Sequence, residues 1–395
     1  MTNPDGIAVS TQKPGRGRPE PLNQKQPMQH RKQTRRTALR GEKAPVTISS
    51  LAKYLKLSPA AVSMVLNSTP KAARFPERTR NRILAAAAKF NYRPNFVARS
   101  LRKQQTFTIG VLVPEVSEGY AALVLAGIED YLLQAGYFYF VVSHRHKTHL
   151  LEQYPRLFME RLVEGIIAVD TTELPVIPQV PTAVVSGHRR MPGITNVVLD
   201  HRRAAHLALE HLLQLGHRRI AFIKGQPFSS DTETRWSSIR DAARKLGLTI
   251  DPNLVTQLQV DSPTPEPGYD VTKSLLAKHR HFTALFAFND ISAIGAIRAL
   301  LDSGMKVPTD VSVIGFDDIQ NAAFQNPRLT TIRQPLRRMG ELAAETLLKR
   351  IRGSEYHKVI AVEPELIVRE STAPAPIESL EGFTEIVGTE TRKTK

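Results

Sequence analysis

An alternation of apolar, strand-like runs with helix-like segments of roughly 12 residues occupies the chain from Thr108 to about Arg369. Runs such as Thr108 to Pro114 and Gly165 to Val169 are continuously apolar, which is typical of strands covered on both faces of a parallel sheet. Helical patterns such as Arg202 to Leu215 separate them. The alternation predicts an α/β fold with parallel sheets. It contains too many strand–helix units for one comfortable sheet, so we expect two lobes.

The bulk composition bounds the class of protein. The chain has 395 residues, of which 41% are hydrophobic, so we expect about two to three globular domains. It has no cysteine, which excludes disulfides, thiolate metal sites and a cysteine nucleophile. No apolar run approaches the roughly 18 residues that span a bilayer, and Met1 to Arg40 lacks the apolar core of a signal peptide. We therefore expect a cytoplasmic protein with no membrane partner.

The positive charge of the chain is confined to its first quarter. The formal net charge is +17, and residues 1–105 hold 22 Lys and Arg against 4 Asp and Glu, a local charge of +18. The remaining residues hold 32 basic against 33 acidic side chains, which is −1. One basic N-terminal module on a neutral body predicts nucleic-acid binding, with binding to a membrane surface as the second interpretation.

Residues 1–44 are rich in Pro, Gln, Arg and Lys and poor in apolar side chains, so we predict a disordered basic arm. Within it, Arg16-Gly17-Arg18-Pro19 resembles an AT-hook, in which two arginines lie in a narrow A·T minor groove. Four residues in a basic tail leave two interpretations open. One is a functional hook, and the other is non-specific attraction to phosphates.

A helix-turn-helix unit is predicted over residues 45–92. Ile48 to Leu55 has helical spacing, Lys56-Leu57-Ser58 is a turn, and Ser58-Pro59 is a helix start with Ser as N-cap and Pro at the first helical position. A third helix from about Pro76 to Phe90 braces the pair. Its expected inner face consists of Ile83, Leu84, Ala87 and Ala88.

Several motifs, taken in order, resemble those of LacI-type repressors, the lactose/galactose repressor family. They are spread over Val46 to Glu370. They comprise Val46–Asn67, the hinge-like Asn91-Tyr92-Arg93-Pro94-Asn95, Ile109–Pro114, Leu215–Ile223, Asn289-Asp290, Val307–Asp318 and Leu329–Pro335.

The resemblance implies an N-terminal all-α helix-turn-helix bundle followed by an α/β two-lobed periplasmic-binding-protein-like domain with parallel sheets. It implies a homodimeric repressor of double-stranded operator DNA, controlled by a small-molecule effector of carbohydrate-like chemistry. The domains expected are a basic arm (1–44), the helix-turn-helix domain (45–92), a hinge and linker (93–106), the two-lobed sensing and dimerisation domain (107–370) and a flexible tail (371–395).

The resemblance also implies which residues contact DNA. In the family, the second helix lies in the major groove, and the hinge forms a helix on operator DNA whose leucine enters the minor groove. The second helix here presents Ala and Met where polar residues and an arginine are frequent, which favours thymine methyl groups over guanine. The stretch Ser68 to Phe75 is longer than usual and either adds phosphate contacts or is a neutral insertion. The expected DNA-binding residues are Thr47, Ser58, Pro59, Ala60, Ala61, Ser63, Met64, Asn67, Asn91, Tyr92, Asn95, Ala98 and Leu101.

The effector site is expected in the cleft between the lobes. By resemblance, Asp290 is the acid that accepts hydrogen bonds from ligand hydroxyls, although it could also be a helix cap. Arg235 is the residue that forks onto a sugar or carboxylate, with a surface salt bridge as the alternative. The expected ligand-binding residues are Tyr120, Ser229, Asp231, Arg235 and Asp290.

One departure weakens any transfer of ligand identity: the aromatic residue that commonly stacks on the ligand is replaced by Pro263. Trp236, the only tryptophan, is interpreted as lobe packing rather than a sugar platform. His144, His146 and His149 form a loose, solvated cluster without a matching acid. We expect no cofactor and no metal.

Three functions from different classes remain open. The leading one is the ligand-controlled repressor. The second is a solute-binding protein for transport, which the basic N-terminal module argues against. The third is an architectural DNA-binding protein with a vestigial sensor pocket, which Pro263 and the apolar second helix favour. A phosphate-binding Gly-Lys-Ser/Thr loop and a His-Glu-x-x-His motif are absent from the sequence, so we expect no enzyme activity.

Overall fold

The structure, a computed structural model, describes residues 46–67, 69–93, 105–116, 119–171, 174–175, 179–260, 262–355 and 357–376. The chain divides into two compact units, Met1–Asn95 and Phe96–Lys395. No helix in the described ranges is both long and apolar enough to cross a membrane. The basic arm, its AT-hook-like segment and the hinge residues Asn95, Ala98 and Leu101 lie outside the described residues.

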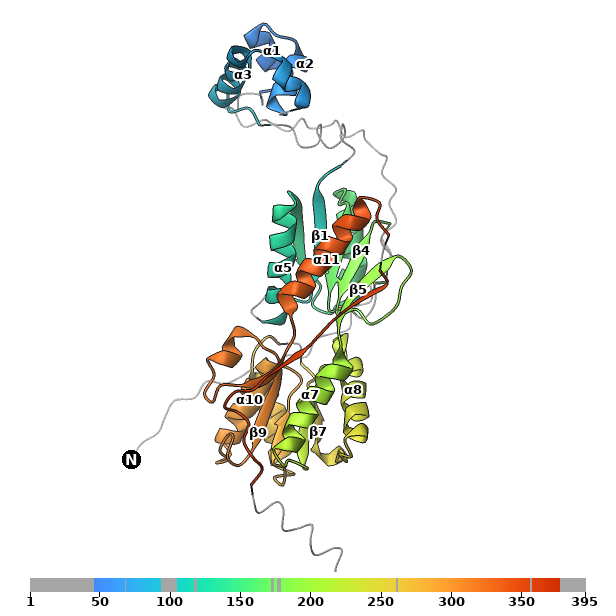
Figure 1. Cartoon of the computed structure of the whole chain (residues 1–395), viewed down its shortest axis with the longest axis vertical. Helices are drawn as coiled ribbons and strands as arrows, with labels where there is room; N and C mark the ends of the chain where they lie inside the picture. Colours follow the sequence, from blue (N-terminus) through green and yellow to red (C-terminus); the bar gives the residue numbers. More distant parts are fainter. Residues whose placement is uncertain are drawn as a thin grey trace, which may run out of the picture. The chain divides into compact units, whose positions relative to one another are not determined.

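The first unit is the predicted helix-turn-helix (Figure 1). Its helices are α1 (Ile48–Leu55), α2 (Pro59–Leu66), the 3₁₀ helix η1 (Pro70–Arg74) and α3 (Glu77–Lys89). The Thr47 side chain caps α1 in a capping box with Ser50, and the Ser58 side chain caps α2 by accepting from the Ala61 amide. These caps fix the two helix starts locally. The stretch interpreted as a loop is partly helical, because η1 lies within it.

The core of this unit corrects the face expected for α3. Ile83 and Ala86 are buried and Ala87 is half-buried, whereas Leu84 is 51% exposed and Ala88 is exposed. Positions three and four apart lie on one face of a helix, so Ile83 and Ala86 face α1 and α2 and Leu84 points to the outside. The prediction was wrong for Leu84 and Ala88.

The second unit begins with a lobe built on a parallel six-stranded sheet. Its strand order is β11-β5-β4-β3-β1-β2. The strands are β1 (Thr108–Val113), β2 (Phe138–Ser143), β3 (Gly165–Val169), β4 (Thr182–Val185), β5 (Ile194–Leu199) and β11 (Val359–Val362).

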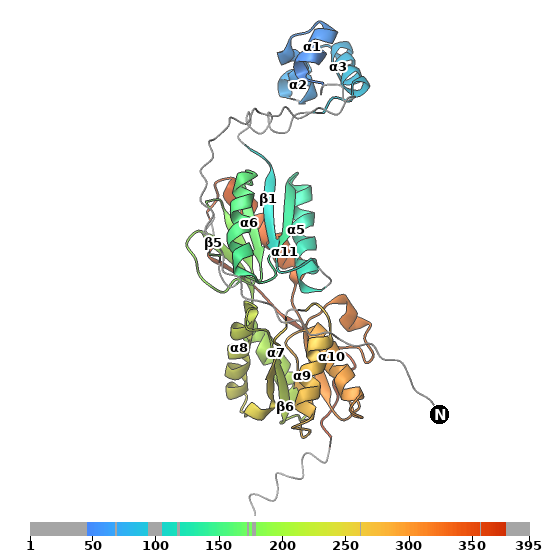
Figure 2. The same cartoon turned by 180° about the vertical axis from the view of Figure 1, so that it is seen from behind.

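Helices cover both faces of this sheet. Figure 1 shows α5 (Tyr120–Gln134) and α11 (Leu336–Ile351) on one face, and Figure 2 shows α6 (Thr148–Glu160) on the other. Helices α5 and α11 pack closely at Gly127 and Gly340. A Cβ atom added at Gly127 would lie 1.9 Å from the Arg337 carbonyl oxygen, so only glycine fits there.

The second lobe carries another six-stranded sheet, in the order β12-β10-β9-β8-β6-β7, with β12 antiparallel to β10. Helices α7 and α8 pack together, as do α9 and α10. The strands are β6 (Ile220–Lys224), β7 (Val255–Gln257), β8 (Ala284–Phe286), β9 (Ser312–Asp317), β10 (Thr330–Arg333) and β12 (Glu365–Ile367). The helices are α7 (His201–Gln214), η2 (Pro252–Leu254), α8 (Asp231–Lys245), α9 (Glu266–Leu276), α10 (Asp290–Leu301) and η3 (Gln320–Ala323).

The chain crosses between the lobes at β5–α7, β10–α11 and β11–β12. The segment after the last crossing corrects the predicted tail. Ser371 is fully buried, its hydroxyl donates to the Val313 carbonyl, and the Ala375 amide donates to the Leu215 carbonyl at 2.8 Å. Residues 371–376 therefore belong to the second lobe, because their backbone groups are satisfied there rather than by water.

Candidate functional site

The exposed start of α2 is the candidate DNA-reading surface. Pro59 and Ala60 are exposed, and Ser63 and Met64 are half-buried. Ala61 is only 6% exposed and belongs to the buried face of α2. The expectation that Ala61 faces outward was therefore wrong, because it packs toward the core with Val62 and Val65.

The other predicted DNA-contacting residues have local partners. Thr47 caps α1, and the Asn67 amide donates to the Ser63 carbonyl at 2.6 Å. Asn91 is exposed with a left-handed φ of 47°, whereas Tyr92 is half-buried against the core of the unit. Several cations of this unit are exposed and available to phosphates. They are Lys53, Lys56, Lys71, Arg74, Arg78, Arg82, Lys89 and Arg93.

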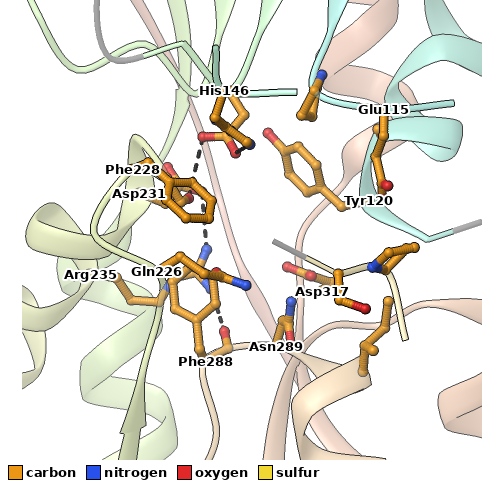
Figure 3. A pocket seen from close by; sticks show the side chains of 17 residues that line it. Glu115, Tyr120, His146, Gln226, Phe228, Asp231, Arg235, Phe288, Asn289 and Asp317 are labelled. Atoms are coloured by element: carbon orange, nitrogen blue, oxygen red, sulfur yellow. Dashed lines mark hydrogen bonds and ion pairs between the residues drawn. The ribbon is translucent and has the colours of Figure 1, made fainter. Parts of the chain in front are cut away.

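A cavity of about 110 Å³ lies between the two lobes of the second unit (Figure 3). Its walls come from segments that follow the carboxyl ends of strands in both sheets, where α/β proteins bind ligands. The side chains that matter below are Glu115, Tyr120, His146, Asp170, Gln226, Phe228, Ser229, Asp231, Arg235, Phe288, Asn289 and Asp317.

Asp231, the first residue of α8, is held by three cationic or proton-donating groups. His188 Nε2 lies 2.6 Å and His201 Nε2 3.3 Å from its Oδ1, and Arg235 Nη2 lies 3.1 Å from its Oδ2. Burial by itself would raise the pKa of this carboxyl. The charges and hydrogen bonds of His201, His188 and Arg235 outweigh burial and hold the pKa well below its usual range. Asp231 is therefore ionised and fixed in place.

Arg235 is buried beside the cavity and is already engaged. Its guanidinium carbon lies 3.7 Å from the ring centroid of Phe316 and 4.4 Å from that of Phe288. Its Nη1 donates to the Phe288 carbonyl at 2.5 Å, and its Nη2 pairs with Asp231. The alternative of a surface salt bridge was wrong, because Arg235 is only 4% exposed.

The N-terminus of α8 binds the first lobe. The Ser230 amide donates to Asp170 at 2.8 Å, and the Ser230 hydroxyl lies 2.5 Å from both the Asp170 carboxylate and the Ser186 carbonyl. The Ser229 hydroxyl adds a bond to Asp170 at 3.3 Å. Ser229 and Asp231, predicted to face the ligand, thus also contact the first lobe across the cleft.

Tyr120 lines the cavity, and its hydroxyl donates to Ser186 Oγ at 2.6 Å. Burial, followed by the nearby Asp231 and Asp170 charges, raises the pKa of Tyr120 well above its usual value. The phenol therefore stays protonated and remains a hydrogen-bond donor.

Asp290 does not line the cavity, contrary to the prediction. It is fully buried, and its carboxylate accepts from the Ile319 amide at 2.9 Å and the Thr331 hydroxyl at 2.5 Å. Burial, with the Asp317 charge second, raises its pKa well above the usual value. The helix cap is the neighbouring Asn289, whose side chain accepts from the Ser292 amide and which does line the cavity. Asp290 is one residue further along the chain than this cap, and its side chain points toward the sheet, where it contacts Thr331 of β10.

The histidine cluster also differs from the prediction. His144 is fully buried, with Nε2 3.1 Å from the Val169 carbonyl oxygen, and burial lowers its pKa to about 4. His146 lines the cavity, and its Nε2 lies 3.6 Å from Asp170. A matching acid therefore exists. It follows a different strand, so spacing along the chain gave no sign of it.

Other cavity residues were missed for the same reason. Asp170 follows β3, Asp317 ends β9, and Phe228 and Phe288 lie in segments after β6 and β8. The sequence feature that could have identified these residues is their position at the ends of apolar strands or directly after them. Trp236 packs edge-on against Phe222 at 5.7 Å between ring centroids, which confirms its interpretation as lobe packing.

Several cavity residues have left-handed backbones although they are not glycine. The φ angle is 51° at His146, 49° at Asp170 and 111° at Asp317. Such conformations persist where the surrounding structure enforces them, and they cluster at functional sites. The cavity wall is thus a strained, tightly specified surface.

One group of described residues has the spacing of metal ligands. Donor atoms of His188, His201 and Asp231 all lie within 4.8 Å of one another. Arg235, 3.1 Å from the same carboxylate, already supplies positive charge there. A bound cation would be repelled by that guanidinium.

The chain carries both a helix-turn-helix unit and a two-lobed domain with a polar cavity. This combination defines the class of ligand-sensing DNA-binding proteins. The comparisons with known proteins agree. The family model of the periplasmic binding protein-like domain matches residues 209–372. The chain is 33% identical to the HTH-type transcriptional repressor PurR of Haemophilus influenzae, over 82% of this chain and 98% of that protein. It is also 33% identical to PurR of Aliivibrio fischeri, over 83% and 98%.

Solved structures share the fold over most of the chain. The lac repressor dimer bound to operator and the anti-inducer ONPF has a TM-score of 0.75 at 26% identity, covering 83% of this chain and 99% of that one. The complex of the regulator CelR with cellobiose has a TM-score of 0.61 at 26% identity, covering 82% and 99%. The chain belongs to the LacI family of transcriptional repressors.

Proposed function

We propose that this chain is a transcriptional repressor whose affinity for a double-stranded operator is controlled by a small molecule bound between the lobes of its second unit. The observation that carries the proposal is the presence on one chain of a helix-turn-helix with an exposed α2 start and a polar cavity lined by both lobes. We infer no enzyme activity. A repressor of this kind acts on chromosomal DNA in the cytoplasm.

Readout of DNA rests on α2 and the cations around it. Pro59 and Ala60 are exposed at the helix start, and Met64 is half-buried one turn later. Ala and Met side chains contact thymine methyl groups rather than guanine edges. Exposed cations such as Lys71 and Arg74 supply phosphate contacts. We therefore expect an operator with essential A·T pairs at the positions that face α2.

A second copy of the chain is the expected protein partner. Strand β2 is one edge of the first sheet, and Phe138 on it is 61% exposed; Leu133 of α5 is 60% exposed. An exposed apolar edge strand is a natural surface for association. The related lac repressor was solved as a dimer on its operator.

Control by a ligand follows from how the cavity is built. Tyr120 and Asp170 come from the first lobe, and Asp231 and Asp317 from the second. A ligand that contacts both lobes stabilises one relative orientation of them, and a coupling of about 1 to 3 kcal/mol to DNA binding is enough. LacI-family neighbours were solved with cellobiose, D-xylulofuranose and ribose, so the effector is expected to resemble a carbohydrate in size and polarity.

The first test is selection of genomic DNA fragments by the purified full chain, followed by anisotropy titration of the best fragment against salt. The expected result is a roughly two-fold-symmetric motif whose binding weakens steeply with salt. Binding without a motif would instead favour the architectural DNA-binding protein, which the apolar surface of α2 leaves as the second candidate.

A charge change on α2 separates DNA contact from folding. Ala60→Asp places a carboxylate in the first turn of α2, where negative charge stabilises a helix but repels DNA phosphate. We expect at least about tenfold weaker DNA binding with unchanged thermal stability. Ala85→Asp, on the exposed side of α3, is the matched control. Equal DNA affinities for the two variants would contradict the assignment of α2 as the reading helix.

A further inference from the structure

The chain enters the first lobe through a short segment, Thr106 and Phe107, that directly precedes β1. Thr106 is 9% exposed and Phe107 is half-buried. Their amides lie outside the ladder of β1, which begins only at Thr108. Because buried amides need an acceptor, the group that accepts from these two amides fixes the place where the chain joins the lobe.

Glu164 supplies that acceptor. It directly precedes β3, and its backbone amide donates to the Thr108 carbonyl at 2.8 Å, which places it beside the start of β1. Its side-chain Oε1 accepts from the Thr106 amide and, at 2.7 Å, from the Phe107 amide. Hydrogen bonds to an ionised carboxylate are roughly twice as strong as those between neutral groups. One carboxylate therefore holds two consecutive residues of the entering chain.

Neighbouring groups hold the same segment. The Tyr137 hydroxyl donates to Glu164 Oε2 at 3.2 Å, and the rings of Tyr137 and Phe107 meet edge-on with centroids 5.4 Å apart. Burial, followed by the Glu164 charge and hydrogen bond, raises the pKa of Tyr137 to about 12, so the phenol keeps its proton and donates. The Thr106 hydroxyl donates to the Leu162 carbonyl at 2.7 Å. We refer to Thr106, Phe107, Tyr137 and Glu164 as the linker clamp.

The linker clamp also sets the direction of the chain. Phe107 has a φ of 48°, a left-handed conformation that a bulky side chain rarely adopts. Such a conformation persists where surrounding contacts enforce it. Here the Phe107 amide donates to Glu164, and the Phe107 carbonyl accepts from the Phe138 amide at 2.8 Å. The direction of the backbone just before β1 is therefore fixed.

We propose that Glu164 is a positioning residue for operator recognition, which limits the spacing between the two half-sites that a dimer accepts. By holding Thr106 and Phe107, Glu164 fixes the length and the starting direction of the tether to the helix-turn-helix unit, for which we expect residues 93–106 as the linker. The inference rests on the function proposed above, because it requires a dimer that reads two half-sites.

The lengths involved make the effect measurable. An extended residue spans about 3.3 to 3.6 Å, so release of Thr106 and Phe107 lengthens each tether by about 7 Å. One base-pair step of B-DNA is about 3.4 Å. Each released subunit therefore reaches about two base pairs further. Affinity for the original spacing changes little, because the entropic cost of closing a flexible loop rises only slowly with its length.

The test uses the operator found by selection, together with derivatives that have one or two base pairs inserted at or removed from its centre. Anisotropy titration of the full-length protein at one salt concentration gives each dissociation constant. The wild type should bind every altered spacing about tenfold or more weakly than the original one. Glu164→Ala should lose about threefold or less on its best altered spacing.

A matched control separates this role from a general loss of negative charge. Glu160→Ala removes an exposed carboxylate at the end of α6 and should show the spacing penalties of the wild type. The inference is overturned if Glu164→Ala keeps the wild-type penalties, or if the wild type itself binds all spacings equally.

Hydrogen exchange tests the linker clamp itself, without DNA. We expect the amides of Thr106 and Phe107 to exchange about tenfold or more faster in Glu164→Ala than in the wild type. Exchange in β9, a buried strand of the second lobe, should not change, which distinguishes release of the clamp from unfolding. Wild-type exchange at Thr106 and Phe107 in the variant would overturn the inference, because Glu164 would then not hold these residues.

A conservative variant keeps the inference falsifiable. Glu164→Gln retains one side-chain oxygen for the two amides but loses the charge, so its spacing penalty should lie between those of Glu164→Ala and the wild type. A purely structural role for Glu164 predicts lower stability with unchanged spacing penalties. If Glu164→Ala does not fold, Glu164→Gln decides, and a wild-type penalty in that variant overturns the inference.

Failure here is distinguishable from failure of the proposed function. A selection that yields no two-fold-symmetric motif would overturn the repressor function and, with it, the role of Glu164 in spacing. A symmetric motif whose spacing penalties do not depend on Glu164 would keep the repressor function and overturn only the inference.

Discussion

The helix-turn-helix unit and the sensor cavity use charge in opposite ways. In the first unit, cations such as Lys71 and Arg74 are exposed around a small apolar core. In the cavity, Asp231, Asp317 and Arg235 are each at most 5% exposed. The partner explains the difference. DNA is a long polyanion that meets many solvated cations, whereas a small ligand is recognised by a few desolvated groups in fixed positions.

The comparison indicates which charged side chains can be removed one at a time without loss of folding stability. A solvated cation contributes little to folding, so one loss is tolerated. A buried ion pair leaves an uncompensated charge when one partner is removed. The predictions below test this contrast, from the largest expected effect to the smallest.

The largest difference in unfolding free energy is expected between the variants Arg235→Ala and Arg74→Ala. Removing Arg235 leaves Asp231 without its guanidinium partner and opens space between Phe288 and Phe316, so we expect a loss of about 3 to 5 kcal/mol in unfolding free energy. Arg74 is exposed, and its loss should change stability by at most about 0.5 kcal/mol. Urea unfolding measures both, and similar values for the two variants would break the comparison.

Ile83→Ala tests the apolar core of the first unit. Ile83 is fully buried, and its truncation should cost about 2 to 5 kcal/mol in that unit, with loss of DNA binding. Leu84→Ala, at a side chain 51% exposed, is the control and should cost far less. Circular dichroism melts read the stability. Equal costs at the two positions would show that the packing of α3 is misassigned.

The pH dependence of stability sharpens the description of the cavity. Burial raises the pKa of Asp317 from 3.8 to about 7, with Asp231 and Asp170 raising it further and Arg235 and Gln334 opposing them. Between about pH 4 and pH 7 the folded protein therefore holds a proton that the unfolded chain has released, so this group makes stability fall as pH rises. Across a single pH unit, this change in the free energy of unfolding is smaller than the losses expected for Arg235→Ala and Ile83→Ala.

Asp317→Asn should remove this component. Stability curves of the variant and the wild type, measured by urea unfolding from pH 4 to pH 8, should diverge as pH rises, with the variant the more stable at the upper end. Parallel curves would mean that ionisation of Asp317 does not change the free energy of unfolding, which would contradict its raised pKa.

The smallest expected effect is local to α2. Ser58→Ala removes the side-chain acceptor of the Ala61 amide, and we expect a loss of about 1 kcal/mol with weaker DNA binding. Ser49→Ala, at an exposed site within α1, is the matched control. Thermal melts and anisotropy check both. An unchanged melting temperature in Ser58→Ala would show that the Ser58 side chain does not stabilise the start of α2.

Local chemistry was enough to predict several elements. The range of α2, Pro59–Leu66, follows from Ser58 as cap and Pro59 at the first position, and β3, Gly165–Val169, is a continuously apolar run. The short strands β7, β10, β11 and β12 were not predicted, because runs of three or four residues carry too little periodicity to be distinguished from a loop.

The sequence by itself determined the starts of α1 and α2, the alternation that specifies parallel sheets, and the family. Each depends on neighbours along the chain: a cap bonds three residues ahead, and a buried strand is apolar throughout. The tertiary structure alone decided the cavity. Asp170 follows a strand of one sheet, Asp317 ends a strand of the other, and Asn289 rather than Asp290 lines the cavity. Long-range packing brings such residues together and sets which way each side chain points, so their meeting leaves no periodic trace in the sequence.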